Sequence, residues 1–289
     1  LMGFASLPEF DKAKKKHSAA VRAIYEKLLR SDEQSPVDAL PSDFDDEPAW
    51  TKLLTAHAFR EPAKALRLIR ELVEGPGFVH VSARTSELAR ELLLKFFGLC
   101  PNSPFKPADS NYGNLSDPDR VLARLDSFIS SYGARSMLYE LWTSNPSLFQ
   151  LLLLLFDRSE FLAEVAIRTP DLVDELELSG RLRRAKTAPE TLRDLRYGLE
   201  DPDQKAWIRK YHQAEFMRIG LRDILGLADF EQNLFELSAL ADACLQYALE
   251  VVMRKHKHKN PPFSIIGLGK LGGEEIIYGS DLDIIFVAD

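Results

Sequence analysis

From residue 118 to residue 258 the sequence is an almost continuous series of helical patterns. Asp117-Pro118, Asn145-Pro146 and Thr169-Pro170 each place a capping side chain before a proline, which cannot continue a preceding helix but suits a first turn. The segment Asp229 to Gln232 is a further capping box. Because the loops between these patterns are short, neighbouring helices are expected to pack antiparallel, as in a helical bundle.

The helices expected in this part share apolar side chains at helical spacing. They cover residues 118–132, 134–143, 146–156, 159–168, 170–176, about 203–226 and 229–258. Nearer the amino terminus, a capping box that begins at Ser6 predicts a helix from about Leu7 to Arg30. Three shorter helices are expected between residues 48 and 97, of which 62–74 and 82–97 are the clearest. The predicted fold class is therefore mainly α, with strands only at the carboxyl end.

Two long connections divide the helical part. Residues 31–47 are acidic and carry two prolines, and we interpret them as a solvated connector because they lack the glycine and spacing of a calcium loop. Residues 101–118 are rich in proline, asparagine and serine. The expected division is a linker helix with an acidic connector at 1–47, a helical linker region at 48–117, a helical bundle at 118–260 and a strand-bearing segment at 261–289.

Charge and apolar patterning exclude several classes of protein. The chain has 37 basic and 44 acidic residues and a net charge of -7, which argues against binding to nucleic acids or anionic membranes. The longest apolar run, Leu148 to Phe156, is about half of what a membrane span needs, so a buried helix or an interface is expected there. No secretory signal is visible at the amino terminus, and Cys100 and Cys244 are interpreted as buried free thiols in a reducing cytoplasm.

Two basic groups have a structural and a functional interpretation. The run Arg254 to Lys259 could bind a metal ion or a phosphate group. Cations at the carboxyl end of a helix are also stabilised by the helix dipole, and we prefer this structural interpretation. The cluster that follows Gly180 is interpreted as a solvated face rather than a partner site. Its members are Arg181, Arg183, Arg184 and Lys186.

The last 27 residues carry the candidate chemistry, because they read as a strand, a glycine-rich turn and a second strand. The second strand is expected to open with Asp281 and Asp283, which then share one face while Leu282 and Ile284 point into a core. Two converging carboxylates suit a hard divalent cation such as Mg²⁺, which commonly also binds nucleotide phosphates. The pair therefore predicts a metal site.

The glycine-rich turn fits a nucleoside triphosphate. Its glycines, Gly267, Gly269, Gly272 and Gly273, would let phosphate oxygens approach the backbone, and Lys270 would add a charge. The turn is neither a P-loop nor a dinucleotide fingerprint, since the required helix and distant acidic residue do not follow. Glu274 and Glu275 are expected in the first turn of a helix, where the dipole stabilises carboxylates.

These motifs resemble the nucleotidyltransferase fold of the DNA polymerase beta type. More narrowly, Gly269-Lys-Leu-Gly-Gly273 with Glu275, followed by Gly279-Ser280-Asp281-Leu-Asp283-Ile-Ile-Phe286, is similar to the signature of bacterial glutamine synthetase adenylyltransferase. Ala134 to Tyr139 and Leu172 to Leu176 resemble the helices that precede its transferase half. The resemblance makes 261–289 the first two strands of a polymerase-beta-type sheet and the start of a nucleotidyltransferase domain.

The resemblance also implies an activity. The family attaches AMP from ATP to a tyrosine of glutamine synthetase and removes it, with two nucleotidyltransferase domains, and the present segment is assigned to the transferase half. Asp281 and Asp283 would be catalytic and hold Mg²⁺. The nucleotide would be bound by Gly269, Lys270, Gly272, Gly273, Gly279 and Ser280. Glutamine synthetase and the nitrogen-signalling PII protein are the implied partners, in the cytoplasm.

Two alternatives stay open at this point. The same fold could serve the removal of AMP, or residues 1–260 could be a helical regulatory module that binds a signalling protein. The superfamily also uses a third carboxylate from a later strand, and the chain begins with Leu1 and ends at Asp289. We therefore expect a fragment of a longer enzyme, with little transferase activity of its own.

Overall fold

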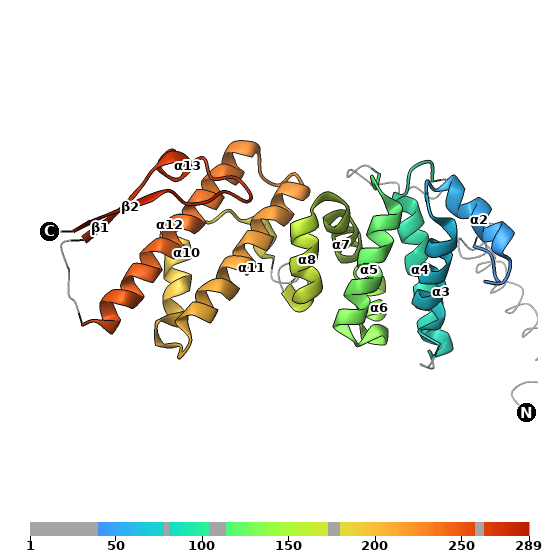
Figure 1. The fold of residues 1–289 in the computed structure, drawn as a ribbon. Helices are drawn as coiled ribbons and strands as arrows, with labels where there is room; N and C mark the ends of the chain where they lie inside the picture. Colours follow the sequence, from blue (N-terminus) through green and yellow to red (C-terminus); the bar gives the residue numbers. More distant parts are fainter. Residues whose placement is uncertain (1–39, 78–80, 104–113, 173–179, 258–262, 289) are drawn as a thin grey trace, which may run out of the picture. The chain divides into compact units, whose positions relative to one another are not determined.

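The structure is a computed structural model that describes residues 40–77, 81–103, 114–172, 180–257 and 263–288. The chain divides into two units, residues 1–50 and 51–289, and each is described by itself. The predicted helix from Leu7 to Arg30 lies outside the described residues. Figure 1 follows the described elements in chain order.

The described end of the first unit leads into helix α2 (Glu47–Ala56). Asp46 caps the start of this helix, since its Oδ1 accepts a hydrogen bond from the amide of Ala49 at 3.1 Å. The indole of Trp50 donates to the carbonyl of Asp43 at 3.0 Å, and its ring stacks on Phe44. The described acidic residues of the connector thus include a helix cap.

The second unit begins with six helices that follow the sequence prediction closely. They are α3 (Pro62–Glu74), α4 (Ala83–Leu99), α5 (Pro118–Tyr132), α6 (Arg135–Ser144), α7 (Pro146–Arg158) and α8 (Glu160–Arg168). Ser82, Asp117 and Ser159 cap α4, α5 and α8, each accepting a hydrogen bond from the first helical turn. The predicted helix over 170–176 falls largely on residues 173–179, which lie outside the described residues.

Helix α7 is the apolar centre of this group, as the run Leu148 to Phe156 predicts. Every residue of that run except Gln150 is buried. Aromatic rings from α5 and α6 pack on it: Trp142 lies 5.0 Å from Phe149, and Phe128 lies 5.8 Å from Phe156, between ring centroids. The run is therefore a buried helix.

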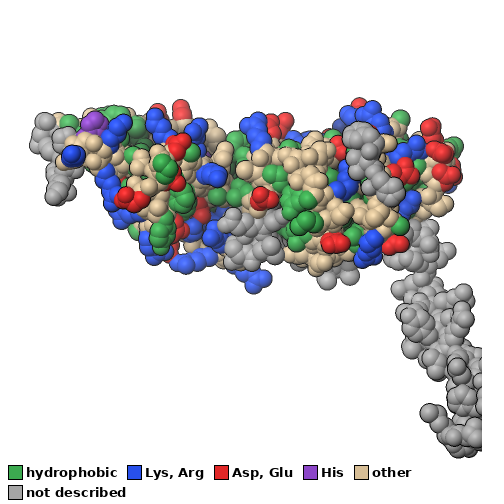
Figure 2. Space-filling view, turned by 90° about the horizontal axis from the view of Figure 1, so that it is seen from below, with side chains coloured by type: hydrophobic (Ala, Val, Ile, Leu, Met, Phe, Trp, Pro, Cys, Tyr) green, Lys and Arg blue, Asp and Glu red, His purple; other side chains and the backbone are tan. Residues whose placement is uncertain are grey.

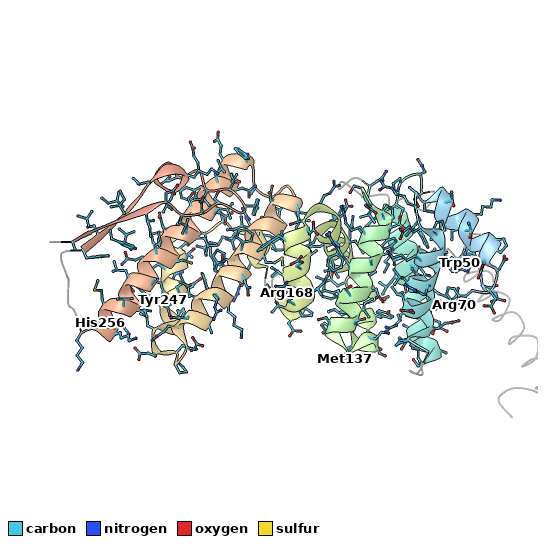
Figure 3. All side chains as sticks on the ribbon, in the orientation of Figure 1. Trp50, Arg70, Met137, Arg168, Tyr247 and His256 are labelled. Carbon is cyan, nitrogen blue, oxygen red and sulfur yellow. The ribbon has the colours of Figure 1, made fainter. Side chains whose placement is uncertain are left out.

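Helices α10 (Ala188–Leu195), α11 (Gln204–Ile224) and α12 (Phe230–Lys255) follow, with short 3-10 turns at Arg181–Arg183 and Arg196–Glu200. The capping box at Asp229 is confirmed, and α11 and α12 lie within one to three residues of their predicted ends. Tyr247 of α12, labelled in Figure 3, donates its hydroxyl hydrogen to the carbonyl of Gly198 at 2.9 Å. Helix α10 was not among the predicted helices.

A network of buried charges holds these helices together and corrects one prediction. Glu236 of α12 binds Arg218 at 2.6 Å and Arg222 at 2.9 Å, and all three side chains are at most 4% exposed. Lys186 binds Glu215 at 2.6 Å with only 18% of its own side chain exposed. The interpretation of the basic cluster as a solvated face is therefore wrong for Lys186, which is part of the interior network.

The two strands form a small antiparallel sheet, and the segment between them packs on α11 and α12. Strand β1 (Phe263–Gly267) pairs with β2 (Ile284–Ala288), with Phe263 opposite Ala288 and Gly267 opposite Ile284. A short helical turn, α13 (Gly269–Gly272), follows β1. Leu271 and Ile276 join Ile219, Leu237 and Leu240 in one apolar cluster, against which Ile284 also packs. The described residues are thus mainly helical with one two-stranded sheet.

The surface carries charges of both signs. Figure 2 shows basic and acidic side chains interspersed over the face that it presents. Among the described residues, no helix is long and apolar enough to cross a membrane. Cys100 and Cys244 are free thiols, and burial raises the pKa of Cys244 to about 12, so it is unreactive near neutral pH.

Candidate functional site

The two candidate carboxylates lie immediately before β2 rather than on it. The strand begins at Ile284, and Asp281 and Asp283 are both exposed. Leu282 between them is 39% exposed, so its predicted place in a core is wrong, whereas Ile284 does pack against the apolar cluster. The carboxylates are therefore presented by an extended segment that the start of the sheet holds in place.

Backbone contacts bring the glycine turn against the second carboxylate. The amide of Leu268 donates to the carbonyl of Asp283 at 2.8 Å, just beyond the last strand pair. Gly269 has a φ of +54°, and a β carbon at this position would lie 2.8 Å from Oδ2 of Asp283. The predicted association of the glycine turn with the carboxylate pair is thus present at Gly269.

Gly272 has a packing role, and the backbone amides of both Gly272 and Gly273 are used inside the turn. A β carbon on Gly272 would lie 2.7 Å from the carbonyl oxygen of Gly267, so only glycine lets α13 lie this close to β1. The amides of Gly272 and Gly273 donate to Leu268 and Gly269 within the turn. These two amides are engaged inside the protein, and a role for the two residues in binding a nucleotide stays a prediction.

The segment between the turn and the carboxylates departs from the sequence expectation. Glu274 has a φ of +56° and follows α13, so the prediction that Glu274 and Glu275 lie in the first turn of a helix is wrong. The amide of Glu275 donates to the carbonyl of Lys270 at 2.8 Å, which closes the glycine turn. The side chain of Lys270 is exposed.

Gly279 and Ser280 form a second turn directly before Asp281. Gly279 has a φ of +78°, a conformation that favours glycine. The hydroxyl of Ser280 accepts a hydrogen bond from the amide of Ile277 at 3.2 Å, and the amide of Ser280 donates to the carbonyl of Ile277 at 3.1 Å. Ser280 thus shapes the turn that leads to the carboxylates, and its role in binding a nucleotide stays a prediction.

The residues present fit a hard cation by their chemistry. Two carboxylates supply only oxygen ligands, which suit Mg²⁺. In the part of the chain that the structure describes, no lysine, arginine or histidine forms an ion pair with Asp281 or Asp283. Within the same residues, no group of three His, Cys, Asp or Glu side chains is arranged to hold a metal. The pair is therefore available to a cation, with no third carboxylate among the described residues.

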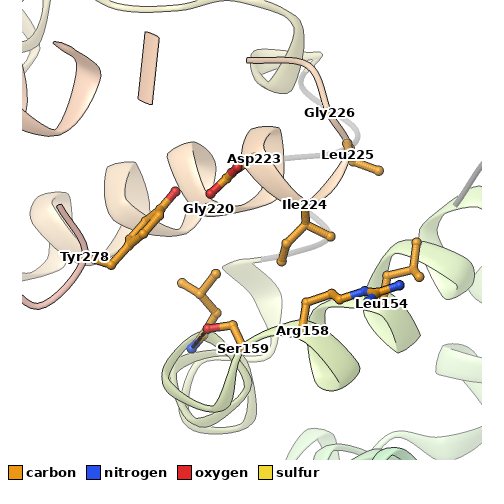
Figure 4. Close-up of a pocket in the computed structure, with 10 residues that line it drawn as sticks. Leu154, Arg158, Ser159, Gly220, Asp223, Ile224, Leu225, Gly226 and Tyr278 are labelled. Atoms are coloured by element: carbon orange, nitrogen blue, oxygen red, sulfur yellow. Dashed lines mark hydrogen bonds between the residues drawn. The ribbon is translucent and has the colours of Figure 1, made fainter. Parts of the chain in front are cut away.

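Sequence reasoning missed the side chains that hold this segment from the helical side. Ser238 of α12 accepts a hydrogen bond from the amide of Ile276 at 3.2 Å, and the hydroxyl of Tyr278 faces the carboxylate of Asp223 of α11. The sequence signal for this contact is Ser238 itself, a polar residue within the apolar stripe of α12. Tyr278 and Asp223 are neighbours in the lining of an open hollow of about 730 Å³ that Arg158 and Ser159 also line (Figure 4).

Comparison with known proteins finds a matching family model. Residues 149–289 match the family model described as glutamate-ammonia ligase adenylyltransferase, a range that includes the glycine turn and both carboxylates. Residues 149–289 are thus similar to the glutamate-ammonia ligase adenylyltransferase family. Glutamate-ammonia ligase is another name for glutamine synthetase, so the predicted resemblance is confirmed.

Three curated members of the glutamate-ammonia ligase adenylyltransferase family show the extent of the similarity. All three are named bifunctional glutamine synthetase adenylyltransferase/adenylyl-removing enzyme. The protein of Thioalkalivibrio sulfidiphilus is 29% identical over 256 residues, 82% of this chain and 25% of its own length. That of Aromatoleum aromaticum is 36% identical over 180 residues, 60% of this chain and 19% of its own. That of Neisseria meningitidis serogroup B is 28% identical over 301 residues, 100% of this chain and 32% of its own. The chain thus spans a third or less of these adenylyltransferases.

Proposed function

We propose that this chain carries part of the active site that transfers AMP from ATP to a tyrosine of glutamine synthetase. The observation that carries the proposal is the pair Asp281 and Asp283, which is exposed and free of cationic partners among the described residues, with Asp283 next to Gly269 of the glycine turn. The pair lies within the range that matches the adenylyltransferase family. We keep the polymerase-beta-type fold of this region as part of the proposal.

Asp281 and Asp283 would hold Mg²⁺. When bound, the cation would lower the negative charge of the reacting phosphate and favour attack by the acceptor oxygen. The carboxylates keep their ligand oxygens available because the backbone pairing of Asp283 with Leu268 uses only its carbonyl. Their fixed place before β2 lets them act without a large rearrangement.

The glycine turn would bind the nucleotide. Gly269 brings the backbone next to Asp283, so phosphate oxygens near this point would meet the turn and the carboxylate pair together. The exposed Lys270 would neutralise phosphate charge. Gly279 and Ser280, in the turn before Asp281, would bind the nucleotide from the opposite side. In the transfer, a tyrosine oxygen forms a bond to the α phosphorus, and the bond to pyrophosphate breaks.

Regulation of glutamine synthetase in the cytoplasm follows from this proposal, with glutamine synthetase as the acceptor and the PII protein as a signalling partner. The printed names of the relatives include the removal of AMP, so removal is the second candidate for this site. Motif similarity to the transferase half favours addition.

One experiment separates the two activities. The natural polypeptide that carries these residues is incubated with purified glutamine synthetase, Mg²⁺ and ATP labelled on the α phosphate, and in parallel adenylylated glutamine synthetase is incubated with inorganic phosphate. Asp281→Asn is expected to abolish labelling of glutamine synthetase and to leave phosphate-dependent release of AMP intact. Loss of release with labelling unchanged would assign the site to removal.

A further inference from the structure

A buried serine of α12 holds one end of the segment that carries the carboxylates. Ser238 is 2% exposed, and its hydroxyl oxygen accepts the amide hydrogen of Ile276, which is 6% exposed. Without this acceptor the amide of Ile276 would be left without a partner in an apolar cluster, which is costly. The bond therefore fixes the chain where it leaves the glycine turn.

An aspartate of α11 holds the same segment two residues further on. The hydroxyl of Tyr278 faces the carboxylate of Asp223, and its ring packs edge-on against Phe216 with centroids 5.3 Å apart. Partial burial raises the pKa of Tyr278, and the neighbouring charge of Asp223 raises it further, so the hydroxyl stays protonated beside that carboxylate. Figure 4 shows the two side chains facing each other.

The two helices that supply these contacts are cross-linked next to them. Arg222, the neighbour of Asp223, binds Glu236, which lies two residues before Ser238, at 2.9 Å. This ion pair is buried, with 4% and 1% of the two side chains exposed. The ion pair between Arg222 and Glu236 thus sets the spacing between Asp223 and Ser238, the two residues that contact the segment.

Packing alone does not hold the segment. A hollow of about 520 Å³ lies beside it, lined by Phe216, Leu240, the stretch from Ile276 to Ser280, and Leu282. Because apolar contacts are incomplete there, the hydrogen bond of Ser238 and the contact of Tyr278 with Asp223 contribute more to fixing the chain. From Tyr278 the chain runs through the turn at Ser280 directly into Asp281.

We propose that Asp223 and Ser238 are positioning residues for the carboxylate pair, acting through Tyr278 and the amide of Ile276. This inference rests on the proposed function, because it assigns the pair to the metal of the transfer reaction. It makes the helical part responsible for the geometry of the site.

The test uses the natural polypeptide with Asp223→Ala, Tyr278→Phe and the double variant, together with Asp223→Asn, which keeps an acceptor oxygen. The Mg²⁺ concentration for half-maximal AMP transfer is expected to rise about fivefold in the first two, the factor that one hydrogen bond represents. The double variant is expected to be no worse than either single variant, and Asp223→Asn is expected to stay near the wild type. Ser238→Ala is expected to show a rise of the same size.

Hydrogen exchange of residues 276–283 gives a second readout that needs no activity. Exchange is expected to quicken there in Asp223→Ala and Ser238→Ala while α3 to α8 keep their protection. Ser86→Ala is the matched control, since Ser86 also joins its helix to distant backbone, at the carbonyl of Val73. Unchanged half-maximal Mg²⁺ with unchanged exchange would overturn the inference, as would a loss of protection spread evenly over the chain. Full transfer by Asp281→Asn would instead overturn the proposed function.

Discussion

The backbone of Gly269 lies directly against the carboxylate of Asp283, so that a β carbon on residue 269 would lie 2.8 Å from Oδ2. The same residue has a φ of +54°, which favours glycine. The glycine turn therefore limits the positions that the carboxylate of Asp283 can adopt. This contact links the two motifs of the candidate site.

Gly269→Ala is expected to displace the carboxylate of Asp283 as well as strain the backbone. We expect the Mg²⁺ requirement of AMP transfer to rise on the order of tenfold or more, since the ligand oxygen must move. Gly133→Ala is the control: its φ is +79° with open space around it, so it isolates the strain, about 1 kcal/mol. Equal Mg²⁺ requirements in the two variants would show that the contact between Gly269 and Asp283 does not affect AMP transfer.

Gly272 and Gly273 give a second matched pair. A β carbon on Gly272 would lie 2.7 Å from the backbone oxygen of Gly267, whereas on Gly273 the nearest contacts are at an ordinary 3.6 Å. Gly272→Ala is therefore expected to lower the thermal midpoint of the polypeptide by the equivalent of about 1–3 kcal/mol. Gly273→Ala is expected to leave it within about 0.5 kcal/mol, and similar losses in both variants would contradict the packing described here.

The charged network predicts a large difference between two glutamates. Glu236→Gln removes the charge that compensates Arg218 and Arg222 in the interior, which is expected to cost about 3 kcal/mol or more in the free energy of unfolding. Glu250→Gln removes the partner of Arg196 at the surface and is expected to cost at most about 1 kcal/mol. Urea denaturation followed by circular dichroism measures both, and equal effects would argue against a buried network.

Helices were predictable from sequence where their ends are marked by local chemistry. Asp117 and Asp229 cap the helices whose starts they predict, because capping depends only on residues within the first turn. Asn145 stands at the predicted start of α7 but its side chain forms no capping hydrogen bond, so the cap predicted there is wrong. Helix α10 carries the same kind of signal, a capping box from Thr187 to Glu190, so its start is also marked by local chemistry.

The interior role of Lys186 could not be predicted from its neighbours. Its partners Glu215 and Asp194 are separated from it by 29 and 8 positions, and only the packing of α10 and α11 brings them together. The positive φ of Glu274 likewise depends on the closure of the glycine turn by Glu275 and Lys270. Local patterns place the carboxylates next to the second strand, although on it rather than before it, whereas their supports at Asp223 and Ser238 depend on tertiary structure.

The most direct measurement is transfer of labelled AMP to glutamine synthetase by the natural polypeptide with Asp281→Asn or Asp283→Asn. Glu274→Gln serves as the control, because Glu274 is an exposed carboxylate of the same segment. Each aspartate variant is expected to lose on the order of a hundredfold or more in Mg²⁺-dependent transfer, with an unchanged circular dichroism spectrum and the control near wild type. Transfer at the wild-type rate in both aspartate variants would contradict the account.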